Sequence, residues 1–446
     1  MPAPRLTLAL ARRASSLTYA EIPDDVVETA RHALLDWFGV TLGGCREDGP
    51  VMLLETLPAA HPSDESAASV VGHRVRLAVL HAALLNGTAS HRLDFDDVNL
   101  SLPGHASVAV GGAALALAEQ RDASGEELIT AFVAGYETAC RLAIAVGPEP
   151  YLRGFHSTGT IGTFAATAAC ARLLGLDAER TTVAFGIAAS EAAGLKCNLG
   201  TMTKSLHAGK ACENGLLAAL LAARGFTAST EAIEIEQGFA ALAGGDCDAL
   251  SAMAEPPRGW HLRENLFKYH ATCFFTHSMI DGIRELRTSA GIEAEQVRSV
   301  TVHVGKLELG ACAIPEPASG LEVKFSLVHL AAMALLDRDT TVVGDDDAAD
   351  PQVLALRPRI ALAEDGCPGE PTRVEIELRD GSTVEAAAEV TEPAADLTLQ
   401  LERLTRKFRA LSEPVIGAPA AEELLAALGS LDSGTSVRRL MSLTAA

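Results

Sequence analysis

The feature that most constrains the fold is a long region in which apolar side chains recur with helical spacing. From Ile22 to about Gly225, alanine and leucine dominate the apolar positions and glycine closes many segments, whereas strand-like alternation is scarce. Residues 24–44, DDVVETARHALLDWFGVTLGG, are typical, with acidic residues in the first turn and glycines at the end. The sequence therefore predicts a large all-helical domain.

The pattern changes after about residue 266. Residues 299–309, SVTVHVGKLEL, and 373–390, RVEIELRDGSTVEAAAEV, alternate apolar and polar side chains, which predicts strands. Asp380-Gly381 within the second run predicts a hairpin turn. The acidic stretch 344–351, GDDDAADP, is interpreted as a loop.

Helical spacing returns near the carboxyl terminus, at residues 395–411 and 420–428. We expect these helices to pack back on the first domain. The predicted fold class is therefore mainly α with an α+β second domain. The helical domain would span 1–265 and be completed by 400–446, and the α+β domain would span 266–399.

Length and charge limit the size of the core and the classes of partner. A chain of 446 residues is long for one hydrophobic core, so two domains are expected. Its 36 Lys and Arg against 58 Asp and Glu give a net charge of −22, which would repel nucleic acid and anionic membranes. An anionic substrate would need a local basic site within this acidic shell.

Cysteine spacing indicates whether disulfides or a metal cluster are expected, and hydropathy indicates whether a membrane span is expected. The nine cysteines are dispersed and form no C-x-x-C pair, which favours reduced thiols over disulfides or a metal cluster. The amino-terminal apolar patch is short, and the runs 106–117 and 216–223 fall well below the roughly 20 residues of a membrane span. We expect a cytoplasmic protein.

The stretch 91–105, HRLDFDDVNLSLPGH, places three carboxylates between two histidines. It lacks the further ligands and the glycine of an EF-hand loop, and no second Asp-rich motif could complete a magnesium cluster. An acid for polyene cyclisation would need aromatic walls, and aromatic residues are 4% of the chain. A solvated acidic helix end stays open, although the flanking histidines favour a functional role.

The stretch 153–164, RGFHSTGTIGTF, places His156 before a run of small residues. It lacks the lysine of a Walker motif and follows no predicted strand, so we interpret its glycines as helix-packing positions. At a helix entrance and partly desolvated, the imidazole would stay neutral and could act as a base. A structural histidine is the alternative.

The stretch 200–215, GTMTKSLHAGKACENG, carries Lys204, His207 and Lys210 at intervals of three. We expect a helix to bring all three to one side, where they would repel one another unless an anion joins them. Clustered positive charge also makes a lysine a better base near neutral pH. A solvated helix face is the alternative.

The stretch 268–277, KYHATCFFTH, lies where the helical pattern gives way to the mixed one. Binding sites favour domain boundaries, so its histidines are candidates for a pocket.

Together these four stretches, with VKFSL at 323–327, resemble the MmgE/PrpD family. Its members include 2-methylcitrate dehydratase, cis-aconitate decarboxylase and iminodisuccinate epimerase. The resemblance covers nearly the whole chain and is specific for the family but not for the reaction. It implies a large helical domain, a smaller α+β lid domain, a homodimer, and neither a metal nor an organic cofactor.

The resemblance also implies which side chains line the pocket. The expected catalytic residues are Asp94, His105, His156, Lys204 and His277. We expect a small anionic dicarboxylate substrate to be bound by His207, Lys210, Lys268, Asn99 and His329.

Three departures from the family pattern bear on the reaction. Val98 stands where a threonine is usual, His329 stands where a tyrosine is usual, and the K-x-Y-P-C-C pattern is altered at residues 268–273. Two hydroxyl groups that could protonate a carbanion or bind a carboxylate are therefore missing. This favours epimerisation of an iminodisuccinate-type substrate over a 2-methylcitrate dehydratase-like or a cis-aconitate decarboxylase-like reaction. A binding protein that has lost the chemistry is a further alternative.

Overall fold

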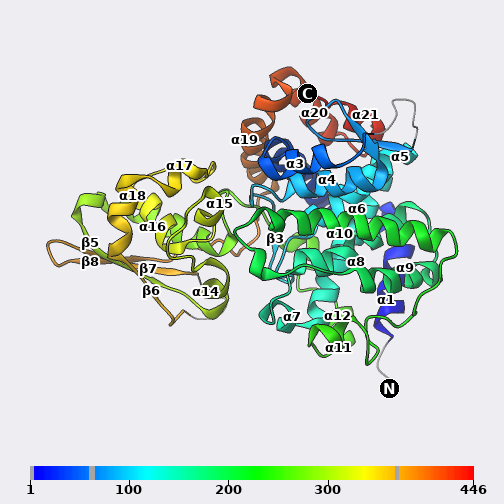
Figure 1. Ribbon diagram of the computed structural model, residues 1–446, viewed down its shortest axis with the longest axis horizontal. Coiled ribbons are helices and arrows are strands. Elements are labelled where there is room, and N and C mark those ends of the chain that lie inside the picture. Colours follow the sequence, from blue (N-terminus) through cyan, green and yellow to red (C-terminus); the bar gives the residue numbers. More distant parts are fainter. Residues whose placement is uncertain (1–4, 60–65, 367–370) are drawn as a thin grey trace. The chain divides into compact units, whose positions relative to one another are not determined.

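The computed structural model describes residues 5–59, 66–366 and 371–446, and the chain divides into two compact units. The first comprises Met1–Cys197, Thr203–Phe267 and Ala394–Ala446; the second comprises Asn198–Met202 and Lys268–Pro393. The first unit is helical and the second contains a four-stranded sheet with helices (Figure 1). The predicted fold class, mainly α with an α+β second domain, is confirmed.

The helices of the first unit follow the predicted periodicity. Their bounds are α1 Leu6–Ser16, α2 Asp24–Gly44, α3 Asp48–Thr56, α4 Val79–Ser90, α5 Ala106–Arg121, α6 Gly125–Val146, α7 Glu149–Leu152, α8 Ser157–Leu173, α9 Ala178–Glu191, α10 Met202–Ala223, α11 Phe239–Ala243, α12 Ala249–Met253, α19 Leu397–Ile416, α20 Ala418–Gly429 and α21 Val437–Ser442. Two short antiparallel ladders accompany them, β1 Ala67–Ser69 with β2 Arg76–Ala78, and β3 Val98–Asn99 with β4 Asn265–Leu266.

The centre of the helical unit is formed by α5, α6 and α8, which pack against one another. Helix α6 begins with a capping box in which Ser124 and Glu127 satisfy each other's backbone groups. It is long and apolar enough to span a membrane, yet 94% of its apolar window is buried inside the protein. These properties are those of a core helix in a helical domain.

The carboxyl-terminal helices complete the helical unit. Helix α19 packs along α2, and α20 contacts both. These helices therefore belong to the same compact unit as the amino-terminal helices. Buried side chains on one side of α19, among them Leu404 and Phe408, account for this packing.

Helices α4, α5 and α10 approach one another closely through small residues. A Cβ added at Gly87 on α4 would collide with the Cys212 sulfur and the Gly209 backbone of α10. A Cβ added at Gly112 on α5 would meet the same sulfur and the Gly87 backbone. Only glycine permits this spacing, so the relative placement of the three helices depends on residues without side chains.

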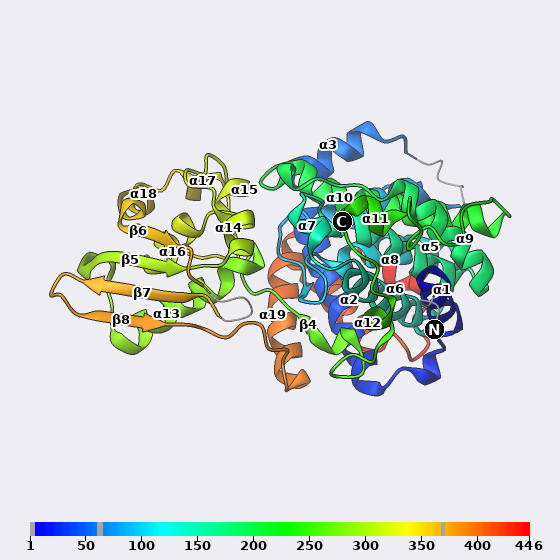
Figure 2. The same ribbon diagram turned by 90° about the horizontal axis from the view of Figure 1, so that it is seen from below.

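The second unit is built on a sheet with the strand order β6-β5-β7-β8, which Figure 2 shows side by side. The strands are β5 Val297–His303, β6 Ile360–Ala363, β7 Arg373–Leu378 and β8 Thr383–Ala386. The β5–β6 pair is parallel and the others are antiparallel. The predicted hairpin at Asp380-Gly381 is confirmed, with Gly381 at φ +87°.

The helices of this unit are α13 His277–Ala290, α14 Lys306–Cys312, α15 Gly320–Val323, α16 Leu327–Leu335, α17 Asp345–Ala348 and α18 Pro351–Leu356. Helix α13 packs against β7, β8 and α16, and α16 packs against β6. The buried apolar residues of these elements form one core, so the sheet and its helices make a single α+β unit.

Two local predictions in this unit are wrong. The strand expected over 299–309 ends at His303, and α14 begins at Lys306. The stretch 344–351, interpreted as a loop, contains α17 and the start of α18. The acidic side chains explain the second error, because Asp347 accepts from the Gly344 amide and Asp350 accepts from the amide of Gln352.

We predict that Gly209→Ala destabilises the protein by about 1–3 kcal/mol, the usual cost of overpacking. The new methyl group would fall on the Leu84 carbonyl and the Thr88 hydroxyl of α4. Urea unfolding measures the effect, and Gly429→Ala is the control because a Cβ there has no atom within 4 Å. Equal stabilities for the two variants would contradict the close approach of α4 and α10.

Candidate active site

Asp96 joins two imidazole rings at the centre of a buried cluster in the helical unit. His91 at the end of α4 has its Nδ1 3.0 Å from both carboxylate oxygens, and His105 before α5 has its Nδ1 2.7 Å from Oδ2. A carboxylate only accepts hydrogen bonds, so each Nδ1 carries a proton. In a neutral ring this leaves Nε2 as the basic nitrogen.

Asp94 connects this loop to helix α10. Its Oδ1 lies 2.9 Å from the Lys204 Nζ and 3.9 Å from the His105 Nε2. Asp94 has φ +53°, a left-handed conformation that residues other than glycine seldom adopt. Such strain persists where the surrounding structure enforces it, and it is concentrated at functional sites.

A second pair of imidazoles lies beside the first. His156, immediately before α8, has its Nδ1 3.1 Å from the Nδ1 of His207 on α10, and its ring stacks on that of His91 at 5.8 Å. One Nδ1 in the pair must donate and the other accept, so the rings hold opposite tautomers. One ring therefore presents a basic Nε2 and the other an Nε2–H.

Burial keeps three of these histidines uncharged. It lowers the pKa of His91 to about 4, although the Asp96 carboxylate opposes the effect. Burial also lowers the pKa of His156 well below its ordinary value, and electrostatic repulsion from the neighbouring His91 and Lys204 would further oppose its protonation. The pKa of His207 is lowered by burial and then by Lys204. The cluster thus pairs neutral imidazoles with an ionic Lys204–Asp94 contact.

Asp96 is the ionised partner in this arrangement. Burial alone would raise the pKa of its carboxyl group, but electrostatic attraction to His105 and His91 and the hydrogen bonds from their Nδ1–H groups hold that pKa well below its ordinary value. The anion is thus stabilised by the two rings that it orients.

Asp97 has the opposite character. Burial and then the charge of Asp36 raise the pKa of its carboxyl group to about 8, against hydrogen bonds from Ser107 (2.6 Å) and Asn265 (2.7 Å) to Oδ2. The Asp97 carbonyl also lies 3.0 Å from the His105 Nδ1. Neighbouring carboxyl groups in one loop therefore differ in protonation because their surroundings differ.

The Asn99 side chain makes hydrogen bonds to nearby backbone groups. Its Nδ2 donates to the His261 carbonyl at 2.8 Å, and its Oδ1 accepts from the Ser101 amide at 2.9 Å. These bonds tie the loop after Asp97 to the segment that leads into β4. Its predicted part in substrate binding stays a prediction.

Lys210 corrects one expectation about α10. Lys204 and His207 are buried, whereas the Lys210 side chain is 48% exposed and pairs with Glu213. The prediction that all three lie on one side of the helix is wrong. Two steps of three residues turn an α-helix by about 600°, so Lys210 lies about 120° away from Lys204 around the axis.

The second unit holds the remaining nominated residues. His277 begins α13, is buried, and its ring lies 4.9 Å from that of His270. The Lys268 Nζ donates to the Thr272 carbonyl at 3.0 Å, and the His329 Nε2 lies 2.9 Å from the Asp347 carbonyl. The roles predicted for His277, Lys268 and His329 stay predictions.

His91 and Asp96 were not nominated from the sequence, although both lie in the quoted stretch. With His105 they offer possible metal-ligand atoms within 4.8 Å of one another. The separations of 2.7 and 3.0 Å are hydrogen-bond distances, so the three side chains bond to one another. This supports a hydrogen-bonded triad more directly than a shared ion.

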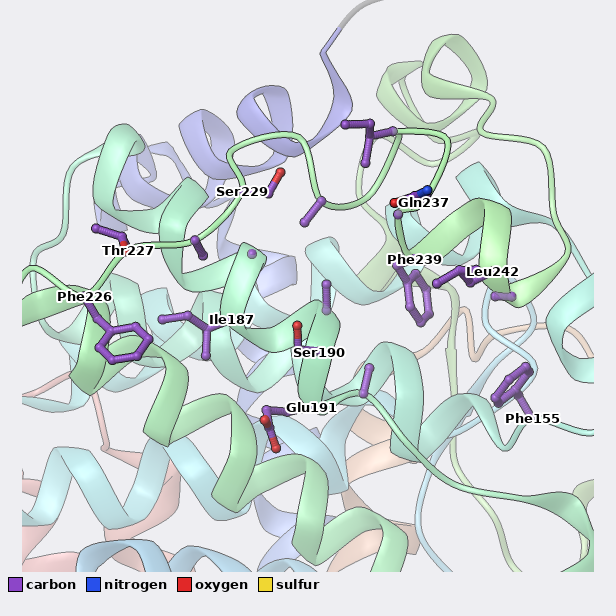
Figure 3. A pocket seen from close by; sticks show the side chains of 18 residues that line it. Phe155, Ile187, Ser190, Glu191, Phe226, Thr227, Ser229, Gln237, Phe239 and Leu242 are labelled. Carbon is purple, nitrogen blue, oxygen red and sulfur yellow. The ribbon is translucent and has the colours of Figure 1, made fainter.

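A separate pocket of about 780 Å³ lies in the helical unit between α9, α11 and the segment 226–239 (Figure 3). Phe226, Phe239 and Leu242 contribute apolar side chains, and Glu191 contributes its carboxylate. Phe155 also lines the pocket, directly before His156 in the chain. None of the clustered acid–base side chains described above lines this pocket.

Comparison with protein families places both parts of the chain in one group. The MmgE/PrpD N-terminal domain matches residues 8–249 and the MmgE/PrpD C-terminal domain matches 270–432. These matches confirm the resemblance found in the sequence.

Curated relatives extend over nearly the full length. A cis-aconitate decarboxylase of Aspergillus terreus is 28% identical, covering 98% of this chain and 95% of the relative. A cis-aconitate decarboxylase of Homo sapiens is 27% identical, covering 96% and 92%. A cis-aconitate decarboxylase-like protein of Aspergillus oryzae is 25% identical, covering 99% and 98%. The chain is thus similar to enzymes named as decarboxylases.

We predict that Asp97→Asn changes the pH dependence of stability. The folded state keeps a proton on Asp97 up to about pH 8, whereas the unfolded chain loses it near pH 4, so this group lowers stability as pH rises between those values. Relative to the variant, wild type should lose roughly 1 kcal/mol of unfolding free energy per pH unit. Urea unfolding at pH 5.5, 6.5 and 7.5 tests this, and parallel curves would contradict it.

Proposed function

Since the chain belongs to the MmgE/PrpD family, we propose that it is a cofactor-independent epimerase of a small imino- or amino-dicarboxylate, of the iminodisuccinate type. It would remove and return the proton on a carbon next to a carboxylate. That the protein is an enzyme follows from its relatives. The dicarboxylate partner, a homodimer and a cytoplasmic location belong to the same proposal.

The observation that carries the proposal is the set of proton carriers beside the Asp96 triad. The His156–His207 pair presents one basic nitrogen and one N–H, and Lys204 lies fixed by Asp94 on the same helix as His207. Epimerisation needs one group to take the proton and another to supply one. A low-dielectric surrounding strengthens the attraction of such groups for an anionic intermediate.

We assign the two proton transfers to His156 and Lys204. The neutral His156 takes the α-proton, the C–H electron pair passes into the adjacent carboxylate, and the Lys204 ammonium protonates the carbon on the other face. The reverse reaction exchanges these roles, and solvent exchange resets both groups. His207 holds His156 through the Nδ1 contact.

Two substitutions support epimerisation over the reactions of the named relatives. Val98 is buried in β3 and paired with Leu266, so an apolar group stands where the family resemblance places a hydroxyl. His329 stands where a tyrosine is usual, and its Nε2 lies at the Asp347 carbonyl. Unlike dehydration, epimerisation needs no acid to protonate a departing hydroxyl group, and unlike decarboxylation it releases no CO₂.

A lyase is the second candidate, because the curated relatives are named cis-aconitate decarboxylases and align over nearly the whole chain. Decarboxylation would use the same proton donors to quench a carbanion after CO₂ leaves. A 2-methylcitrate dehydratase-like reaction would instead use a donor beside the departing hydroxyl.

Proton NMR in D₂O distinguishes the candidates. Iminodisuccinate stereoisomers, 2-methylcitrate and cis-aconitate are each incubated with the enzyme. Deuterium uptake at the α-carbon with inversion supports the epimerase, a new alkene from 2-methylcitrate indicates a dehydratase, and CO₂ release from cis-aconitate indicates a decarboxylase. Absence of exchange or turnover with every acid would overturn the proposal and favour a binding protein.

We predict that Lys204→Ala and His156→Ala each lower turnover at least about 10²-fold, the lower end for loss of a general acid or base. Arg224→Ala is the control, because this exposed cation directly follows the same helix and is not among the residues expected to contact the substrate. Initial rates at saturating substrate measure the effect. Near-normal rates in the first two variants would remove these residues from the mechanism.

A further inference from the structure

Lys407 on α19 reaches the loop that carries Asp94 and Asp96. Its side chain is 6% exposed, and its Nζ lies 2.6 Å from the Asp36 Oδ1 on α2. The same Nζ donates to the Phe95 carbonyl at 2.6 Å and lies 3.9 Å from the centre of the Phe95 ring. A lysine 312 positions away in the sequence therefore binds the residue between the two cluster carboxylates.

Phe95 lies between the two carboxylate residues of the cluster, so its backbone conformation affects both. The preceding residue, Asp94, has the left-handed φ of +53° and contacts Lys204. The following residue, Asp96, contacts His91 and His105. A rotation of the Phe95 peptide group would move both carboxylates, and the Lys407 ammonium holds the oxygen of that group.

Asp36 compensates the charge on Lys407, and the Lys407 ammonium group also makes contacts with Phe95. Burying an ammonium group is costly unless it is paired and its protons are bonded. Here one proton goes to the carboxylate and another to the Phe95 carbonyl, and the Phe95 ring covers the ammonium group. The contact with the loop is thus part of what satisfies the buried charge.

We propose that Lys407 is a positioning residue for the reaction, which fixes the Asp94–Asp96 turn by holding the Phe95 carbonyl while Asp36 balances its charge. This inference rests on the proposed function, since it assigns the carboxylates of that turn to the placement of Lys204, His91 and His105. The contacts of Lys407 that carry this inference are those with Asp36 and the Phe95 carbonyl.

A purely structural role for Lys407 makes a different prediction. If the lysine only joined α19 to α2, removing both members of the ion pair would restore stability and activity together. Replacing a buried pair by uncharged groups is often neutral for stability, whereas removing one member leaves an uncompensated charge. Stability and catalysis can therefore be separated by comparing Lys407→Met with the double variant Lys407→Met/Asp36→Asn.

We expect Lys407→Met to lower both the melting temperature and the turnover number. In the double variant the melting temperature should recover, while the turnover number stays about 10- to 10²-fold below wild type, the effect of a displaced catalytic group. The Michaelis constant should change less than the turnover number. Recovery of both quantities in the double variant would overturn the proposal.

The matched control is Arg141→Met/Glu137→Gln. Arg141 is also a buried cation beside a carboxylate, 3.7 Å from Glu137, and it donates to the carbonyls of Ala252 and Ala254. It holds a different segment of backbone, so this variant should keep the wild-type turnover number per folded molecule. A loss as large as that of the Lys407 double variant would contradict a specific role for Lys407.

A readout without turnover separates this inference from the proposed function. Nitrogen-15 NMR of histidine-labelled protein reports whether His91 and His105 carry their protons on Nδ1, with His91→Gln and His105→Gln assigning the signals. The Lys407 double variant should lose or shift these Nδ1–H signals. Unchanged signals would overturn the positioning role, whereas an inactive wild type with altered variant signals would overturn only the proposed function.

Discussion

The candidate site depends on the shared carboxylate of Asp96. By accepting from the Nδ1 of both His91 and His105, it fixes the orientation of two rings and leaves Nε2 as their basic nitrogen when neutral. Burial disfavours charge on His91, His156 and His207, and this permits their rings to stack and to share a proton between like nitrogens. In water the same rings would be solvated individually and would have no fixed tautomer.

The helices bring together imidazole rings that come from different parts of the chain. His91 lies at the end of α4, His105 precedes α5, His156 precedes α8, and Lys204 and His207 belong to α10. Glycines at the contacts of α4, α5 and α10 bring three of these helices close. The net charge of −22 is spread over the protein, while the cluster brings together a lysine and four histidines. A local environment for an anion can thus exist within an acidic protein.

Periodicity predicted the helical unit, the α+β unit and the Asp380-Gly381 hairpin, because these depend on local patterns. Five of the ten nominated residues, Asp94, His105, His156, Lys204 and His207, lie in one buried cluster, since they occupy the loop between α4 and α5, the residue before α8 or the first turns of α10. The exposure of Lys210 could have been predicted from helical geometry. The central role of Asp96 could not, because it requires the left-handed turn at Asp94, which is held by residues distant in the sequence.

The helical unit is interrupted by the second unit and resumes only at Ala394. During synthesis on a ribosome, α2 would emerge long before α19. The face of α2 that packs against α19 would therefore stay uncovered while the whole second unit is synthesised. Long-range contacts of this kind form late and slow the folding of a domain. The loop around Phe95 would therefore reach its final geometry only after α19 has left the ribosome, which ties formation of the site to synthesis of the segment that follows the second unit.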